Sequence, residues 1–221
     1  FLFIPATIGS ITWLCLNETN VSKIKHGLVI ACVGDSGKFT YKKTRQQDAD
    51  IDKIATHVLR NSGKVFEIID FSPYGYDERQ YCSPGFDLPV GCLTRTSHGQ
   101  FPEYHTSADN LNYVQPENLA DSYSMYWAVL NTLENNKKYL NQNPKCEPQL
   151  GKRGLYQRGL YQMTGGEKNT KAKQLAMLWA LNLSDGNHSL LDISDRSGLD
   201  FGLIKDAADA LSQHNLLKEY S

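Results

Sequence analysis

The stretch G-L-V-I-A-C-V-G, residues Gly27–Gly34, decides the fold class, because it is an uninterrupted apolar run bounded by glycines. Such a run is typical of a strand that is covered on both faces of a sheet. Two further apolar runs, Val65–Phe71 and Leu88–Leu93, predict strands of the same sheet, and F-L-F-I at Phe1–Ile4 predicts a buried strand. A buried strand at residue 1 suggests a preceding segment, so we expect the chain to be part of a longer protein.

Helical patterns alternate with these strands. Apolar residues recur at helical spacing from Ile51 to Leu59, and Asn61-Ser62-Gly63 is expected to end that helix. The stretch Ile8–Leu16 is close to helical spacing, and a long helix is expected from Pro116. Along one side of the long helix lie Leu119, Tyr123, Tyr126, Leu130 and Leu133. Alternation of strand and helix up to about residue 139 predicts an α/β fold, a mixed sheet flanked by helices.

The composition changes after this first unit. Residues 141–170 are rich in Asn, Gln, Lys, Gly and Pro, as in a linker or an extended segment, and they contain R-G-L-Y-Q twice in tandem within 153–162. From residue 171 the sequence predicts three helices and a final strand, with a turn at Ser197-Gly198, which is the layout of a winged helix-turn-helix. The expected division is therefore an α/β domain at 1–140, a linker at 141–170 and a winged-helix domain at 171–221.

Composition and charge exclude several classes of protein. The 23 basic and 24 acidic side chains leave a net charge of −1, which argues against a dedicated nucleic-acid or membrane-surface binder. No apolar run has the roughly 18 residues that a membrane span requires. The five cysteines are odd in number and include no C-x-x-C pair, a pattern of reducing compartments, so we expect a cytoplasmic protein. Homo-oligomerisation is left open.

The charge of the predicted winged helix argues against DNA binding. Residues 171–221 carry five basic and seven acidic side chains, and the presumed recognition helix, Asp200–Ser212, contains three Asp and one Lys. Phosphate contacts supply most of the non-specific affinity for DNA, and this surface would repel phosphates. A role in packing or in protein contacts is favoured, and transcriptional regulation is disfavoured.

Polar segments that follow two predicted strands carry the candidate site residues. The segment Tyr76–Gly85 presents Asp77, and the segment Thr94–Asn110 presents His105. A carboxylate and an imidazole on two strand-end loops are suitable zinc ligands with open coordination positions. Two further residues, Asp109 and Thr106, are candidates to orient the histidine ring. From spacing alone, solvated polar loops remain the alternative.

The other polar groups of the sequence do not predict a functional site. The basic run Lys42, Lys43 and Arg45 is interpreted as a solvated loop and not as a phosphate site. Cys82 is interpreted as a packed thiol, since no histidine is indicated as its partner. Gly34–Gly37 is interpreted as a turn, since it lacks the glycine spacing of a nucleotide-binding loop.

Four blocks of sequence carry a resemblance to a known family. In chain order they are F-I-P-A-T-I-G-S-I, D-E-R-Q-Y-C-S-P-G, P-E-Y-H-T-S-A-D-N and C-E-P-Q-L-G-K-R-G-L-Y. Together they resemble bacterial aminopeptidase-like proteins that are often encoded near surface-polysaccharide genes. Those proteins join a domain of the co-catalytic zinc aminopeptidase and glutamate carboxypeptidase clan to a small winged helix. The resemblance implies that Asp77 and His105 ligate zinc, with up to two ions in a complete protein, and that Arg79 or Tyr104 contacts a small peptide or other amide substrate.

Two departures from the family pattern bear on activity. Ala6 stands in P-A-T-I-G-S where related proteins commonly have P-E-T-I-G-S, with the Glu at the clan's general-base position. The clan's first His and bridging Asp come from an earlier part of its sequence, so the resemblance covers an N-terminally incomplete domain. It implies a hydrolase at the level of the family, inactive as this chain alone, with Glu78 or Glu103 as substitute bases. The alternative is a catalytically inactive binding or scaffold protein. The substrate itself is left open.

Overall fold

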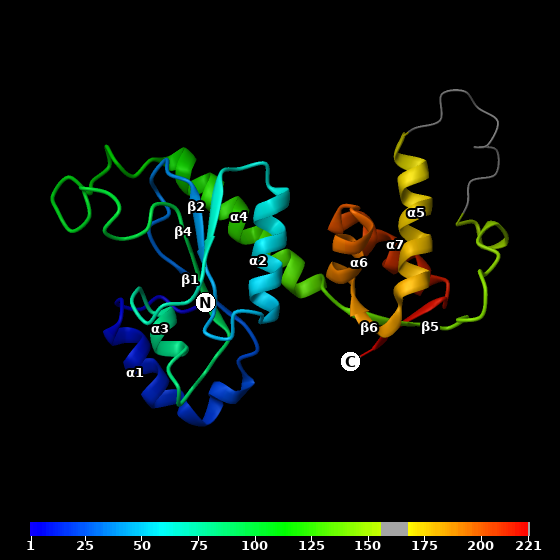
Figure 1. The fold of residues 1–221 in the computed structure, drawn as a ribbon, viewed down its shortest axis with the longest axis horizontal. Coiled ribbons are helices and arrows are strands. Elements are labelled where there is room, and N and C mark those ends of the chain that lie inside the picture. The colour runs from blue at the N-terminus through cyan, green and yellow to red at the C-terminus, as the bar shows by residue number, and fades with distance from the viewer. Residues whose placement is uncertain (156–167, 221) are drawn as a thin grey trace. The chain divides into compact units, whose positions relative to one another are not determined.

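The computed structural model describes residues 1–155 and 168–220, which fall into two units, Phe1–Asn131 and Thr132–Ser221 (Figure 1). This division comes earlier in the chain than the expected boundary at residue 140. Most of the tandem R-G-L-Y-Q repeat lies outside the described residues. Within the described ranges, none of the helices combines the length and the apolar character that a membrane crossing requires.

A mixed sheet forms the centre of the first unit. Its strands are β1 (Gly27–Ile30), β2 (Phe39–Lys42), β3 (Phe66–Ile69) and β4 (Val90–Thr94), in the order β1-β4-β2-β3. The pairs β1–β4 and β2–β3 are parallel, whereas β2 and β4 are antiparallel. The predicted α/β class with a mixed sheet is confirmed. The sequence did not predict β2, because F-T-Y-K is short and ends in a lysine.

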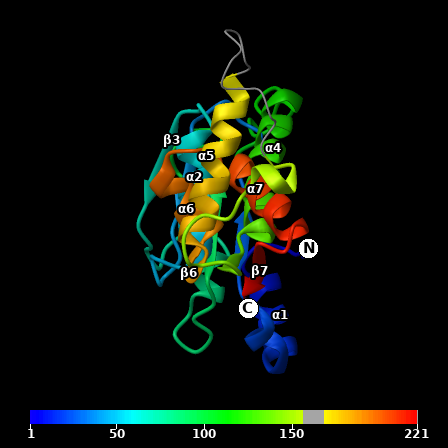
Figure 2. The same cartoon turned by 90° about the vertical axis from the view of Figure 1, so that its right-hand side faces the viewer.

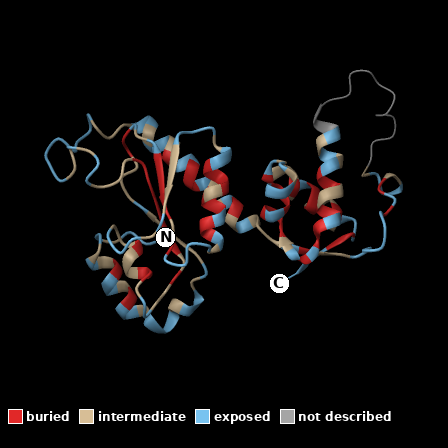
Figure 3. Ribbon diagram, in the orientation of Figure 1, coloured by how far each residue is buried: buried red, intermediate tan, exposed pale blue. Residues whose placement is uncertain are grey.

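Helices α1 (Ile8–Asn17), α2 (Asp50–Asn61), α3 (Glu78–Tyr81) and α4 (Pro116–Asn135) accompany this sheet, with a 3-10 helix η1 at Glu18–Lys23. The predicted helices are confirmed, and Gly63, at a φ of 69°, follows the end of α2 as expected. Figure 3 shows that the buried residues concentrate on strands and helices, while exposed residues dominate the connecting segments.

Two predicted strands need correction. Phe1–Ile4 forms no strand, and its phenylalanine side chains are exposed. The strand β1 ends at Ile30, and Cys32 has a φ of 47°, which is incompatible with a continuing strand. The prediction that the strand is covered on both faces is also wrong for the described residues, because Gly27–Val29 are only half-buried and Ile30 is 53% exposed. Apolar sequence indicates a tendency to be buried, but the presence of a neighbour is a tertiary property.

The predicted inner side of α4 is also partly wrong. Leu119 and Tyr123 are exposed, and the buried side instead carries Ser122, Met125, Tyr126, Val129 and Thr132. The hydroxyl of Ser122 donates to the Val33 carbonyl at 2.8 Å, and the hydroxyl of Tyr126 donates to the Leu93 carbonyl. These two bonds fix the rotation of the helix against the sheet. That rotation cannot be predicted from the spacing of apolar residues alone.

The second unit combines helices with a small sheet. Helices α5 (Lys168–Leu183), α6 (Leu190–Ser197) and α7 (Phe201–Gln213) group together (Figure 2), and a 3-10 helix η2 covers Gly151–Arg153. Strands β5 (Lys138–Asn141), β6 (Asp185–Ser189) and β7 (Leu217–Tyr220) form an antiparallel sheet in the order β6-β5-β7. The three predicted helices and the final strand are confirmed, whereas β5 and β6 were not predicted.

Candidate functional site

The two predicted site segments meet through aromatic rings. Because β3 runs antiparallel to β4, the two segments leave the sheet at opposite ends of the strands. The ring centroids of Tyr76 and His98 nevertheless lie 4.8 Å apart, and those of His98 and Tyr104 lie 6.3 Å apart. Tyr104 in turn stacks on His105 at 4.0 Å. The structure therefore brings the segments of Asp77 and His105 together through side-chain contacts.

Asp77 binds the turn that carries Ala6. Its Oδ1 accepts hydrogen bonds from the backbone N–H of Thr7 at 2.5 Å and from the hydroxyl of Ser10 at 3.2 Å. Thr7 has a φ of 64°, an unfavourable conformation for a β-branched residue, which the bond from its own N–H helps to hold. Two of the resembling blocks, far apart in sequence, are thus joined at Asp77.

His105 is exposed, and its backbone has a φ of 59°. Within residues 1–155 and 168–220, no hydrogen bond joins its ring to Asp109 or Thr106. The Thr106 hydroxyl instead donates to the Glu103 carbonyl at 2.7 Å and accepts from the Ala108 N–H at 3.2 Å. The orienting role of Asp109 and Thr106 therefore stays a prediction.

A complete metal site is not formed by the described residues. In that part of the chain no group of three or more His, Cys, Asp or Glu side chains is arranged to hold an ion. The donor set of these residues alone therefore does not fit a zinc site with three protein ligands. The assignment of Asp77 and His105 as ligands stays a prediction.

Glu78 forms a buried ion pair. Its side chain is 0% exposed, and Oε1 lies 2.8 Å from Nζ of Lys42, which is 7% exposed and also donates to the Tyr74 carbonyl at 2.8 Å. Gly75 closes over the pair, since a Cβ there would lie 2.2 Å from Oε1. The interpretation of Lys42 as part of a solvated loop is wrong, because its charge is matched inside the protein. A carboxylate held in this way is poorly placed to activate water, which argues against Glu78 as a base.

The remaining predicted residues are Arg79, Tyr104 and Glu103. Arg79 is half-buried, and in the described part of the chain its Nε is buried without an acceptor. Tyr104 packs edge-on against Phe101 at 5.4 Å. Burial, with smaller effects of the Asp35, Glu103 and Asp109 charges, raises the pKa of Tyr113 to about 12. The role of Glu103 as a base, like substrate contact by Arg79 or Tyr104, stays a prediction.

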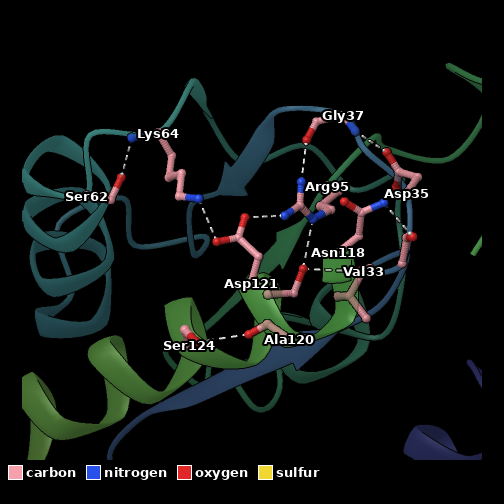
Figure 4. Close-up of polar contacts among 12 residues, drawn as sticks. Val33, Asp35, Gly37, Ser62, Lys64, Arg95, Asn118, Ala120, Asp121 and Ser124 are labelled. Carbon is pink, nitrogen blue, oxygen red and sulfur yellow. Dashed lines mark hydrogen bonds and ion pairs between the residues drawn. The ribbon is translucent and has the colours of Figure 1, made fainter. Parts of the chain in front are cut away.

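Arg95 organises the loop that follows β1, and sequence reasoning missed it. It is 5% exposed, and its guanidinium contacts Asp121 Oδ2 at 2.5 Å, the Gly37 carbonyl at 2.8 Å and the Ser122 hydroxyl at 2.9 Å (Figure 4). Lys64 reaches the other oxygen of Asp121 at 2.8 Å. The hydrogen bond from Lys64 and that from Arg95 hold the pKa of Asp121 below its usual 3.8. No local pattern signals these partners, which come from three separate segments.

A second carboxylate, that of Asp35, also holds the loop that follows β1. Asp35 is buried and accepts from the Gly37 N–H at 2.7 Å and from the Thr96 hydroxyl at 2.6 Å. The interpretation of Gly34–Gly37 as a turn therefore agrees with the structure. Cys82 is buried, and burial raises the pKa of its thiol, which confirms the prediction of a packed thiol.

Both units match known protein families. Residues 1–136 match the family described as "Domain of unknown function (DUF4910)", and residues 137–219 match a winged helix-turn-helix family. A Clostridium acetobutylicum protein named "Putative polysaccharide biosynthesis protein with aminopeptidase-like domain" is 55% identical over 218 residues, which are 99% of this chain and 49% of the relative.

One solved structure is similar over the whole chain. A crystal structure of a putative peptidase from Clostridium acetobutylicum is similar with a TM-score of 0.88 and 52% identity, over 100% of this chain and 48% of the other. BSAP, a zinc aminopeptidase from Bacillus subtilis, reaches a TM-score of only 0.48 at 14% identity, over 57% of this chain and 32% of the other. The chain spans about half the length of the clostridial relatives. It belongs to the DUF4910 family, with an aminopeptidase-like first domain that is followed by a winged helix-turn-helix domain.

Proposed function

We propose that this chain is an aminopeptidase-like binding unit that recognises a small peptide or other amide-containing ligand, and that these 221 residues do not hydrolyse it by themselves. The ligand class is supported by the aminopeptidase-like name of the 55% identical relative and by the peptidase name of the similar crystal structure. A cytoplasmic location belongs to the same proposal.

The proposal that this chain does not hydrolyse its ligand rests on one observation. The turn at residues 6–7 is tied to Asp77 through the 2.5 Å bond from the Thr7 N–H, and it carries the methyl group of Ala6. Activation of a water molecule needs a positioned proton acceptor, and a methyl group cannot accept a proton. The nearby Glu78 is already paired with Lys42. The turn is therefore held in place without a base on it.

A zinc-dependent hydrolase is the second candidate. It is favoured by the four sequence blocks and by the names of the clostridial relatives. In that case Asp77 and His105 would be two of the zinc ligands, and further ligands and the base would come from polypeptide outside these 221 residues. Since the described residues hold no group of three donors, we assign no step of hydrolysis to the metal.

Binding and turnover distinguish the two candidates. In the presence of Zn²⁺, we expect the chain to release p-nitroaniline from aminoacyl-p-nitroanilides no faster than buffer does. Ala6→Glu supplies a carboxylate on the turn but is expected to stay inactive as well, because the described residues also hold no group of three metal-binding side chains. Short peptides should still bind saturably. Tyr104→Ala should weaken that binding by about tenfold or more, since a stacked ring is lost at the proposed site. Isothermal titration and a continuous absorbance assay supply the two measurements.

Leu111→Ala is the matched control, because Leu111 is an exposed loop residue and its loss should leave peptide affinity unchanged. Stoichiometric zinc together with turnover, both lost in His105→Ala, would establish the hydrolase and refute the proposal. Absence of saturable peptide binding would refute the proposed binding unit.

Nucleic-acid binding by the winged helix is expected to be absent. The single lysine of α7, Lys205, lies 2.6 Å from Asp209 and is neutralised by it. An electrophoretic mobility assay of the full chain on random duplex DNA should therefore show no salt-sensitive complex at micromolar protein, where non-specific binders already associate. A complex that weakens steeply between 50 and 200 mM salt would contradict this expectation.

A further inference from the structure

A cavity opens in the second unit beside the C-terminal end of α5, where β5 and β6 pass (Figure 1). Its volume is about 740 Å³, and the residues that line it come from β5, the segment that follows β5, the last turns of α5 and the start of β6. Small-molecule sites in proteins usually have volumes of about 300–1,000 Å³. The cavity therefore has room for a small organic ligand.

Asn141, at the end of β5, joins the walls of this cavity by hydrogen bonds. Its backbone N–H donates to the Ser184 carbonyl at 2.7 Å, and its side-chain amide donates to the Leu181 carbonyl at 2.7 Å. Its Oδ1 accepts from the Asn143 N–H at 2.8 Å, in the segment that follows β5. These bonds hold the strand, the helix end and the following segment together, so the cavity is a built part of the fold.

One part of the cavity wall is apolar. It is formed by three leucines and two prolines, Leu140, Leu178, Leu181, Pro144 and Pro148. Leu181 is 5% exposed and belongs to the core of the second unit, so this part of the wall is firmly supported. A hydrocarbon group that covers these side chains loses contact with water, which favours binding.

The charged groups of the wall are both acidic. They are Glu147 and Asp185, and among the described residues no Lys, Arg or His lines the cavity. The hydrogen bond from His188, with a further bond from the Asn187 N–H, lowers the pKa of Asp185 to about 2, so this carboxylate is ionised at neutral pH. A carboxylate accepts up to about four hydrogen bonds. Oδ2 of Asp185 faces the His188 ring at 3.1 Å, while the backbone bonds go to Oδ1. Oδ2 therefore keeps capacity for a ligand.

Ser184 adds a polar group that the described part of the chain leaves unused. The residue is 3% exposed and lines the cavity, and its hydroxyl has no hydrogen-bond partner among the described residues. Burial of a hydroxyl without a partner costs free energy, so such groups are rare in folded proteins. A ligand that donates a hydrogen bond would satisfy this oxygen.

We propose that this cavity binds a small organic cation, in which a protonated amine is attached to an apolar body. The leucines and prolines contact the apolar body, Glu147 and Asp185 attract the ammonium group, and Ser184 accepts one of its hydrogen bonds. An anionic ligand would meet two carboxylates without a cation to pair with. The site lies in the second unit and is distinct from the proposed peptide site at Tyr104. It also gives a role to the start of the block C-E-P-Q, which the proposed function does not use.

Three probes that share one apolar body test the proposal: 2-phenylethylammonium, 2-phenylethanol and 3-phenylpropionate. Each is titrated into the full ¹⁵N-labelled chain, and the amide signals are followed by NMR. We expect saturable changes with the ammonium probe at the amides of residues 140–141 and 181–185. The alcohol should bind at least about fivefold more weakly, and the carboxylate should not bind. Equal affinity for the three probes, or no change at these amides, would overturn the proposal.

Variants of the full chain locate the binding groups. Glu147→Gln should weaken binding of 2-phenylethylammonium by about two- to fivefold, the range of a partly screened ion pair. Ser184→Ala should weaken it by a similar factor without lowering the thermal midpoint, because the hydroxyl makes no hydrogen bond within the described residues.

Asp206→Asn is the matched control, since it removes one negative charge from an exposed position of α7 outside the cavity. It should leave the affinity for 2-phenylethylammonium unchanged. An equal loss in Asp206→Asn and Glu147→Gln would reveal a general attraction to the acidic unit and overturn the assigned site. Unchanged affinity in both Glu147→Gln and Ser184→Ala would overturn it as well.

Discussion

Lys42→Met is expected to lower the free energy of unfolding by about 3–5 kcal/mol, the usual cost of leaving one member of a buried ion pair without its partner. Glu78 is completely buried, and Lys42 is its charge partner at 2.8 Å. The substitution keeps most of the side-chain volume, so the loss reports on the charge and not on a cavity. Urea unfolding of the full chain, followed by circular dichroism, measures it.

Lys43→Met is the control for this result. Lys43 pairs with Asp70 at 3.0 Å, but that aspartate is largely exposed, and exposed pairs contribute about 0–1 kcal/mol. The double variant Lys42→Met/Glu78→Met should recover most of the lost stability, because it leaves no unpaired charge in the interior. Equal losses for Lys42→Met and Lys43→Met would show that the Lys42–Glu78 pair has no special role.

Arg95→Met is expected to cost about 2–4 kcal/mol, somewhat less than a fully buried pair because Asp121 keeps Lys64 as a partner. The variant also loses the hydrogen bonds to the Gly37 carbonyl and the Ser122 hydroxyl, so the loop after β1 should become mobile. Thermal unfolding measures the first effect, and amide exchange at residues 33–37 measures the second. Arg45→Met, which breaks the exposed pair with Asp87, is the control and should cost less than about 1 kcal/mol.

The cost of Arg95→Met should depend on pH. Because the pKa of Asp121 is lower in the folded chain than its usual 3.8, the contribution of this carboxylate is present above pH 3.8 and is lost as the pH falls through the folded value. The stability difference between wild type and Arg95→Met should therefore narrow in acid. A difference that stays constant between pH 7 and pH 3 would contradict the assigned Arg95–Asp121 ion pair.

The aspartate in Y-D-E-R and the histidine in Y-H-T were singled out as candidates by the resemblance of their sequence blocks to a known family, and not by spacing alone. The side chains that surround these two residues could not be predicted from the sequence. The bond from the Thr7 N–H to Asp77 joins residues far apart in the chain, and the rings from Tyr76 to His105 come from two loops. Glu78 and Asp77 are adjacent carboxylates in the same polar block. The Glu78 side chain is nevertheless paired with Lys42 in the interior, whereas the Asp77 side chain binds the turn at Thr7.

Local pattern alone determined the helices α1, α2 and α4, the strands β3 and β4, the winged-helix layout of the second unit and the near-neutral charge, since periodicity and capping act over a few residues. Strand order, the antiparallel placement of β2, the rotation of α4 and the pairing of Lys42 and Arg95 were decided only by tertiary structure. The physical reason is that a short strand or a buried charge is stable only with partners from distant segments. The exposed side of α1 follows the same rule, because its sequence demands burial and only the fold shows which side is left uncovered.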